Sequence, residues 1–181
     1  MRIFVGVILF NFLFSCADLE KSKQLNQLNG LNKKNDSLSI VLRQINDLQL
    51  TREIEQKHGL LTDLTTFTSS DTLIESEARL IDRYVNKIDL LCSLKRNLDK
   101  LKIALVTQKS DLKNLGNDIK NGSGKRNMYN QNLNFEGKKL NLIENELNQI
   151  KNNKSKTINE ITILNQNIRL LIEKLQSKIK K

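Results

Sequence analysis

Residues 84–119 read YVNKIDLLCSLKRNLDKLKIALVTQKSDLKNLGNDI and carry a large apolar or aromatic residue at every seventh position. The repeat consists of Tyr84, Leu91, Leu98, Leu105, Leu112 and Ile119, and Leu94, Leu101 and Leu115 follow three residues after members of it. A seven-residue repeat of this kind places its apolar side chains on one face of an α-helix, where a second helix can pack. We therefore expect one long helix over about residues 72–121, opened by a capping box at Thr72–Glu75.

The repeat resumes after Asn121–Gly124, where two glycines within three residues favour a reversal of the chain. Two sets of seam positions follow it. The first is Leu133, Leu140, Leu147, Lys154, Ile161, Ile168 and Leu175, and the second is Ile143, Ile150, Thr157, Leu164 and Leu171. We expect a second long helix over about residues 126–179, antiparallel to the first. Lys154 and Thr157 interrupt the seam, which predicts either a device that sets the register or a local opening.

A shorter helix is expected before these two, over about residues 37–57. Its apolar residues have the three-and-four spacing of an amphipathic helix and are Leu38, Val41, Leu42, Ile45 and Leu48. Asp36 and Ser37 are suitable N-caps, and His58 followed by Gly59 is a suitable end. The Thr- and Ser-rich residues 60–71 indicate a connection.

These patterns predict an all-α fold over residues 37–181, a long antiparallel helical hairpin with an additional shorter helix, as an elongated bundle or coiled coil. Aromatic residues make up only 4% of the chain, and Pro and Trp are absent, which argues against a β-sandwich or barrel core. Four apolar residues lie beside or off the seam, and we expect the hairpin to cover them poorly: Ile158, Ile163, Leu170 and Ile172. To cover them, the helices either fold back on themselves as a compact bundle or pair with another chain, for example as a homodimer.

The first sixteen residues predict export and lipidation. Arg2 precedes a short apolar run, Ile3–Phe14, which is typical of a signal peptide over residues 1–15 and too short to span a bilayer. Leu13-Phe14-Ser15-Cys16 resembles the lipobox of bacterial lipoproteins, in which fatty acyl groups such as palmitate anchor the Cys to the membrane. The alternatives are an ordinary cleaved signal with an incidental Cys, or a buried apolar helix.

Residues 16–36 are rich in Asn, Lys, Gln and Ser, and we expect them to form a flexible polar tether. If Cys16 is acylated, Cys92 is the only free thiol of the mature chain, so no intrachain disulfide can form. The sequence leaves open whether Cys92 is buried or forms an intermolecular disulfide. Its place beside the seam residue Leu91 favours a half-buried site.

The composition argues against an enzyme. One His and two Cys are too few for a His/Cys metal site, and we expect His58 to face solvent near a helix end. Acidic pairs such as Glu144/Glu146 stand two residues apart on a helix and so do not face each other. Gly122-Ser123-Gly124-Lys125 lacks the preceding strand of a phosphate-binding loop. We expect no catalysis, no metal and no cofactor.

Positive charge is concentrated toward the end of the chain. The whole chain has a formal net charge of +10, and twelve Lys/Arg stand against five Asp/Glu from Gly122 to Lys181. Much of this suits an ordinary solvated helix surface, but it also predicts contacts with a polyanion, either a glycosaminoglycan or anionic lipid. The candidate contact residues are Lys125, Arg126, Lys138, Lys139, Lys151, Lys154 and Lys156. Nucleic acid is disfavoured, because the aromatics that stack bases are scarce.

With the lipobox, the Asn/Lys-rich segment and the absence of Pro and Trp in view, the whole chain resembles the plasmid-encoded outer-surface lipoproteins of borrelial spirochaetes. The stretch from Leu73-Ile74-Glu75-Ser76-Glu77 through Arg83 to Leu94–Lys102 looks like the central helices of their all-helical, complement-regulator-acquiring group. The resemblance implies a helical bundle, a lipid anchor at Cys16 in the bacterial outer membrane, display at the cell surface and a virulence-associated role.

In that group several members dimerise, and some bind host complement regulators, complement components or plasminogen. This chain is shorter than those members, so no binding residue is transferred to it. The functional hypothesis is a surface lipoprotein that binds a host macromolecule from serum, complement or matrix. The alternatives are a polyanion adhesin, a self-associating structural lipoprotein of the envelope, and an accessory protein facing the periplasm.

Overall fold

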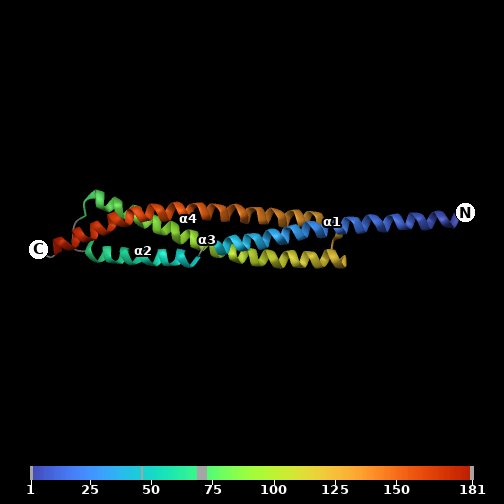
Figure 1. Cartoon of the computed structure of the whole chain (residues 1–181), viewed down its shortest axis with the longest axis horizontal. Helices are drawn as coiled ribbons and strands as arrows, with labels where there is room; N and C mark the ends of the chain where they lie inside the picture. The colour runs from blue at the N-terminus through green and yellow to red at the C-terminus, as the bar shows by residue number, and fades with distance from the viewer. Residues whose placement is uncertain (1, 46, 69–72, 180–181) are drawn as a thin grey trace. The chain divides into compact units, whose positions relative to one another are not determined.

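The computed structural model describes the backbone of residues 2–45, 47–68 and 73–179, and the side chains of residues 19–45, 48–66 and 73–178. Within these ranges the regular elements are four α-helices and one short 3-10 helix, without a strand (Figure 1). The α-helices are α1 (Arg2–Gln44), α2 (Asp47–Thr68), α3 (Glu75–Asn121) and α4 (Tyr129–Ile179), and the 3-10 helix is η1 (Arg126–Met128). The predicted all-α fold class is confirmed.

The helices build two compact units. Unit 1 comprises Met1–Val41 and Lys102–Asn145, so it contains α1 with the second part of α3 and the first part of α4. Unit 2 comprises Leu42–Leu101 and Glu146–Lys181, which brings α2 together with the remaining parts of α3 and α4. Each unit is therefore a three-helix arrangement, and each is described separately.

In unit 2 the two long helices run antiparallel. The Lys174 ammonium lies 2.6 Å from a Glu77 carboxylate oxygen, and the Tyr84 hydroxyl donates to the Asn165 side chain at 2.7 Å. The Lys87 ammonium lies 2.5 Å from a Glu160 carboxylate oxygen. Later residues of α3 thus pair with earlier residues of α4, which is the antiparallel arrangement that the sequence predicted.

In unit 1, α1 runs parallel to α4. Hydrogen bonds join Gln24 to Asn130 at 3.1 Å and Lys34 to Asn141 at 2.7 Å, with nearly the same separation in sequence, 106 and 107 residues. Gln27 bonds Asn134 with the same spacing of 107 residues.

The seam residues form the cores of both units. Tyr84, Leu91 and Leu112 are completely buried, and so are Leu133 and Leu140 on α4. Burial disfavours the phenolate and raises the pKa of Tyr84 to about 12. At Gly116, α1 comes so close to α3 that an added Cβ would meet the Leu28 side chain at 2.8 Å. Of the four residues expected to be poorly covered, Ile163 and Leu170 are exposed, Ile158 is intermediate and Ile172 is buried.

The prediction of a flexible tether over residues 16–36 was wrong, because these residues lie within α1. Leu28 is 6% exposed and continues the apolar seam of Leu38 and Leu42 toward the N-terminus. Gln24 and Asn35 occupy further seam positions and are also buried. Polar residues in a seam can be ordered when neighbouring helices supply packing and hydrogen bonds.

The expected helix over 37–57 was also wrong in its bounds. Its first part belongs to α1, and α2 continues through His58 and Gly59 to Thr68. The hydroxyls of Thr62 and Thr66 donate to carbonyls four residues earlier, so they bond within the helix instead of ending it. Residues 69–71 of the expected connection, and Thr72 of the expected capping box, lie outside the described residues.

Both ends of α3 have identifiable caps. At the start, the main-chain N–H of Ile74 donates to the Glu77 carboxylate at 3.1 Å, two residues beyond the predicted box. At the end, Gly122 has φ of 66° and the N–H of Ser123 donates to the Asp118 carbonyl at 2.9 Å. This pattern is a Schellman motif, and it ends α3 at Asn121 as predicted. The short helix η1 precedes α4, which begins three residues later than expected.

Candidate functional site

Cys16 lies within the backbone range of α1, but its side chain and those of the expected signal peptide lie outside the described residues. Lipidation at Cys16 therefore stays a prediction. Among the described residues, none of the helices combines the length and apolarity that crossing a membrane requires.

Two of the seven candidate polyanion contacts lie at the turn between α3 and α4 in unit 1. Lys125 and Arg126 are both exposed, and the Arg126 guanidinium donates to the Gly122 carbonyl at 2.7 Å. The ammonium of Lys21 on α1 donates to the carbonyl of Lys120 at 2.8 Å. We call the cations Lys21, Lys120, Lys125 and Arg126 the basic end. A hollow of about 380 Å³ opens among them and is lined by Lys21, Lys120 and Arg126.

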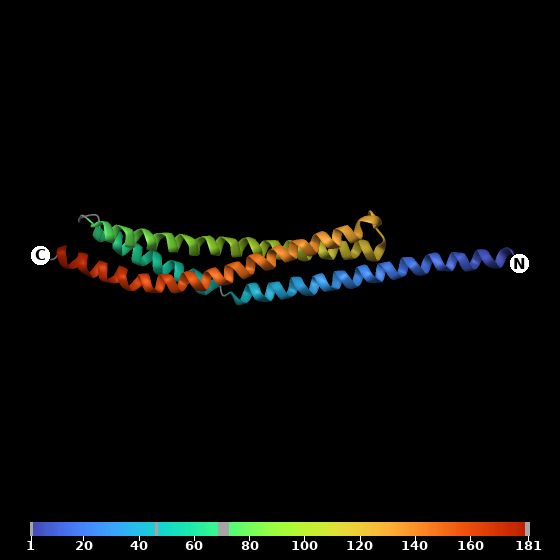
Figure 2. The ribbon, with the colours of Figure 1, turned by 90° about the horizontal axis from the view of Figure 1, so that it is seen from above.

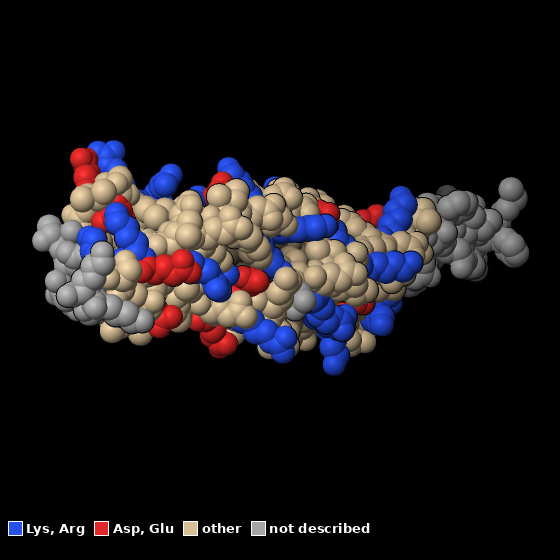
Figure 3. Space-filling view, turned by 60° about the vertical axis from the view of Figure 1, so that its left-hand side comes forward, with Lys and Arg blue, Asp and Glu red and all other residues tan. Residues whose placement is uncertain are grey.

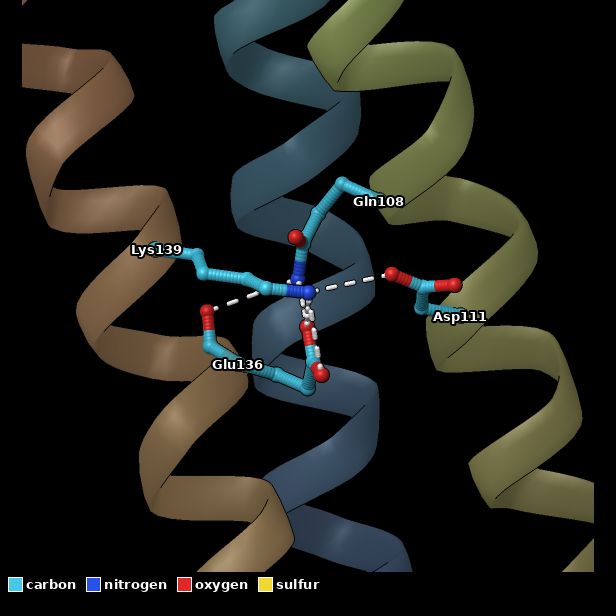
Figure 4. Close-up of polar contacts among 4 residues, drawn as sticks. All are labelled: Gln108, Asp111, Glu136 and Lys139. Carbon is cyan, nitrogen blue, oxygen red and sulfur yellow. Dashed lines mark hydrogen bonds and ion pairs between the residues drawn. The ribbon is translucent and has the colours of Figure 1, made fainter.

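Two further candidates, Lys138 and Lys139, lie on α4 in unit 1, and only Lys138 is exposed. Lys139 points toward α3, and its ammonium lies 3.0 Å from Asp111 on α3 and 3.0 Å from Glu136 on its own helix, α4 (Figure 4). The side-chain amide of Gln108, only 2% exposed, donates to the same Glu136 carboxylate at 2.7 Å. Lys139 is thus part of a polar network between α3 and α4.

The electrostatics of this network favour the charged lysine. Partial burial by itself lowers the pKa of Lys139, but hydrogen bonds to Glu136 and Asp111 outweigh it and raise the pKa overall. Because the ammonium is already paired with two carboxylates, Lys139 is poorly placed to bind an external anion.

The last three candidates lie in unit 2. Lys151 and Lys156 are exposed, whereas Lys154 reaches inward and donates to the main-chain carbonyl of Ile45. Lys125 and Arg126 therefore lie together at one turn. Lys139 and Lys154 instead bond to groups within their own units. Figure 3 shows basic side chains interspersed with acidic and uncharged ones on the face that it draws.

The only His of the chain lies near its one described Cys. The Cys92 sulfur on α3 is 3.9 Å from the Nε2 atom of His58 on α2. Cys92 is half-buried, as the sequence predicted, and His58 is exposed, although it lies in the interior of α2 and not at its end. Among the residues that the structure describes, no three His, Cys, Asp or Glu side chains gather as metal ligands.

A surface hollow in unit 2 combines apolar and charged side chains. It has a volume of about 500 Å³ and is lined by Arg83 on α3 and Ile163 on α4, next to the ion pair of Lys87 and Glu160. That ion pair lowers the pKa of Glu160. Ile163 is 66% exposed, and Leu170, one heptad later, is 63% exposed. The sequence indicated both residues because they lie off the seam, but it gave no sign of the hollow.

Comparison with known proteins adds no relative: no family model, no curated protein and no solved structure matches this chain.

Proposed function

We propose that this protein is a lipid-anchored, non-catalytic binding protein of the bacterial outer membrane, displayed at the cell surface to a host macromolecule. The observation that carries the proposal is the apolar run Ile3–Phe14 followed directly by Ser15 and Cys16. A thiol at this place suits acylation, and several acyl chains hold a protein on a membrane far more firmly than one.

The hollow beside Ile163 supports binding to a protein. The exposed side chain of Ile163 and the partly exposed Leu164 lie beside Arg83, Lys87 and Glu160. This gives the mixture of apolar contact and charge that protein interfaces use. The resemblance to borrelial surface lipoproteins points the same way, toward a component of serum or matrix.

The test of display uses intact cells that make the full chain. Metabolic labelling with a fatty acid should mark the wild-type protein, and external protease should remove it without lysis. The variant Cys16→Ser should lose the label and leave the membrane fraction. Continued membrane association of Cys16→Ser would refute the anchor, and complete protection of the acylated protein from protease would refute display.

The test of binding is retention of a serum protein by the full chain at physiological salt. Ile163→Glu should abolish retention, because it places a charge in the apolar part of the hollow. Ser155→Glu adds the same charge at another exposed position of α4 and should retain binding. Equal retention by both variants would refute this site.

A polyanion adhesin is a second candidate, supported by the exposed cations Lys125, Arg126, Lys138, Lys151 and Lys156. Retention on heparin that falls steeply with salt would favour it. Retention that is insensitive to charge reversal at these residues would contradict it.

A further inference from the structure

The distance between the predicted lipid anchor and the packed part of unit 1 is short. Lys21 is held at α3 by its hydrogen bond to the Lys120 carbonyl, 2.8 Å long. Gln24, three residues later, is buried and bonds Asn130 on α4. Five residues separate Cys16 from Lys21, and even fully extended they span only about 18 Å. A lipid at Cys16 would therefore keep this end of unit 1 near the membrane surface.

The end of unit 1 held in this way is the basic end. Lys120, Lys125 and Arg126 lie at the turn between α3 and α4, and α1 runs past this turn (Figure 2). Among the described side chains, Glu20 lines the hollow and Asp118 stands two residues before Lys120, so the four cations of the basic end outnumber these two carboxylates. Glu20 also accepts a hydrogen bond from the Asn130 amide at 2.8 Å.

The turn that presents these cations is well ordered by its hydrogen bonds. The Schellman bond from Ser123 to Asp118 fixes the chain after α3. The Tyr129 hydroxyl donates to the Asp118 carbonyl at 2.9 Å and also contacts the Ser123 carbonyl. The backbone that carries these cations is thus held in place by hydrogen bonds, so contact with a partner need not order the turn itself.

We propose that the basic end docks on the anionic phospholipid surface to which Cys16 is anchored. This inference rests on the proposed lipidation. Basic groups within a Debye length of an anionic membrane are attracted to it, and the attraction weakens as salt rises. The anchor supplies proximity and the cations supply orientation, so the turn between α3 and α4 faces the lipid head groups.

The experiment uses the full acylated chain reconstituted into vesicles of equimolar phosphatidylcholine and phosphatidylglycerol, or of phosphatidylcholine alone. In a Cys92→Ser background, Ser123→Cys carries a fluorophore at the turn. Ser110→Cys is the matched control. Ser110 is exposed on α3 and lies about 15 Å before Lys120 along the helix, away from the turn. A head-group spin label in the lipid quenches a fluorophore that lies at the surface.

We expect strong quenching of the label at 123 in anionic vesicles at low salt, and weak quenching at 110. Reversing Lys125→Glu and Arg126→Glu together should lower the docked population by about fivefold or more for each cation. The pair Lys113→Glu and Lys138→Glu changes the same charge elsewhere in unit 1 and should have less effect. Equal quenching at the two labels, equal quenching in both vesicles, or no response to Lys125→Glu with Arg126→Glu would overturn docking.

The intact mass of the protein before reconstitution separates this inference from the proposal on which it rests. An acylated chain whose turn is not quenched would overturn docking and leave the anchor in place. A chain without acyl groups on Cys16 would overturn both.

Discussion

The side-chain ammonium of Lys154 on α4 donates a hydrogen bond to the main-chain carbonyl of Ile45, at the break between α1 and α2. Carbonyls at the end of a helix lack an N–H partner from the next turn. Lys154 occupies a seam position that would otherwise carry an apolar residue. The Lys154 side chain that interrupts the apolar seam therefore supplies a hydrogen-bond donor to a carbonyl at the break between α1 and α2. Thr157, one turn later on α4, is also buried in the seam.

Replacing Lys154 by Met should lower the free energy of unfolding by about 1 kcal/mol, although Met is more apolar, because the carbonyl of Ile45 loses its donor. Urea unfolding of the full chain measures the change. Lys156→Met is the control at an exposed position and should change stability by less than about 0.5 kcal/mol. A Lys154→Met variant as stable as the wild type would contradict this role.

Two exposed glycines with open space around them should respond to Ala in opposite ways. Gly59 lies inside α2, so Gly59→Ala should raise the free energy of unfolding by about 0.5 to 1 kcal/mol. Gly124 has φ of 73°, so Gly124→Ala should lower it by about 1 kcal/mol. Thermal unfolding followed by circular dichroism would detect both, and shifts of the same sign would show that backbone conformation does not decide the effect.

Asn35 on α1 occupies the seam of unit 1 and is 1% exposed, and its side-chain oxygen has no hydrogen-bond partner among the described residues. Asn35→Leu should therefore stabilise the fold by about 1 to 2 kcal/mol, since it removes an unsatisfied buried acceptor. Asn26→Leu, on the exposed side of α1, should have little effect. A destabilised Asn35→Leu variant would mean that the amide has a partner that the described contacts lack.

Stability should fall in acid through Glu77. Hydrogen bonds from Lys174 and from the N–H of Ile74 lower the pKa of Glu77 below its ordinary value of 4.5. A carboxylate with a lowered folded-state pKa contributes stability above the unfolded pKa, and this is lost as pH falls through the folded pKa. The stability difference between wild type and Glu77→Gln should thus be present at pH 7 and shrink below about pH 4.5.

Urea midpoints at neutral and acid pH test this expectation, with Glu55→Gln as a control that removes an exposed carboxylate from α2. A difference between wild type and Glu77→Gln that stays constant with pH would contradict the role of the charge. The interaction lies at the start of α3, so its loss should be seen first as fraying of that helix.

The sequence predicted the two long helices well, because their seams follow a simple period. The seam residues Leu91, Leu98 and Leu112 are all buried, and α3 ends at the predicted residue, Asn121. These features depend on local spacing and on the glycine pair of the turn, both of which can be found without knowing which helices meet.

The N-terminal part could not be predicted in the same way. Residues 16–36 look polar in composition, but Gln24 finds Asn130 and Lys34 finds Glu144, partners more than 100 residues away. The sequence also could not show that Lys139 and Lys154 bond within their units, because their partners Asp111 and Ile45 become neighbours only in the folded chain. Each of these predictions was wrong because it depended on a partner that is distant in the sequence.

Lipidation at Cys16 is tested most directly by the mass of the amino-terminal fragment of the protein purified from the membranes of cells that make it. We expect a fragment that begins at Cys16 and carries the added mass of acyl chains. A fragment that retains residues before Cys16, or an unmodified Cys16 on a freely secreted protein, would contradict it.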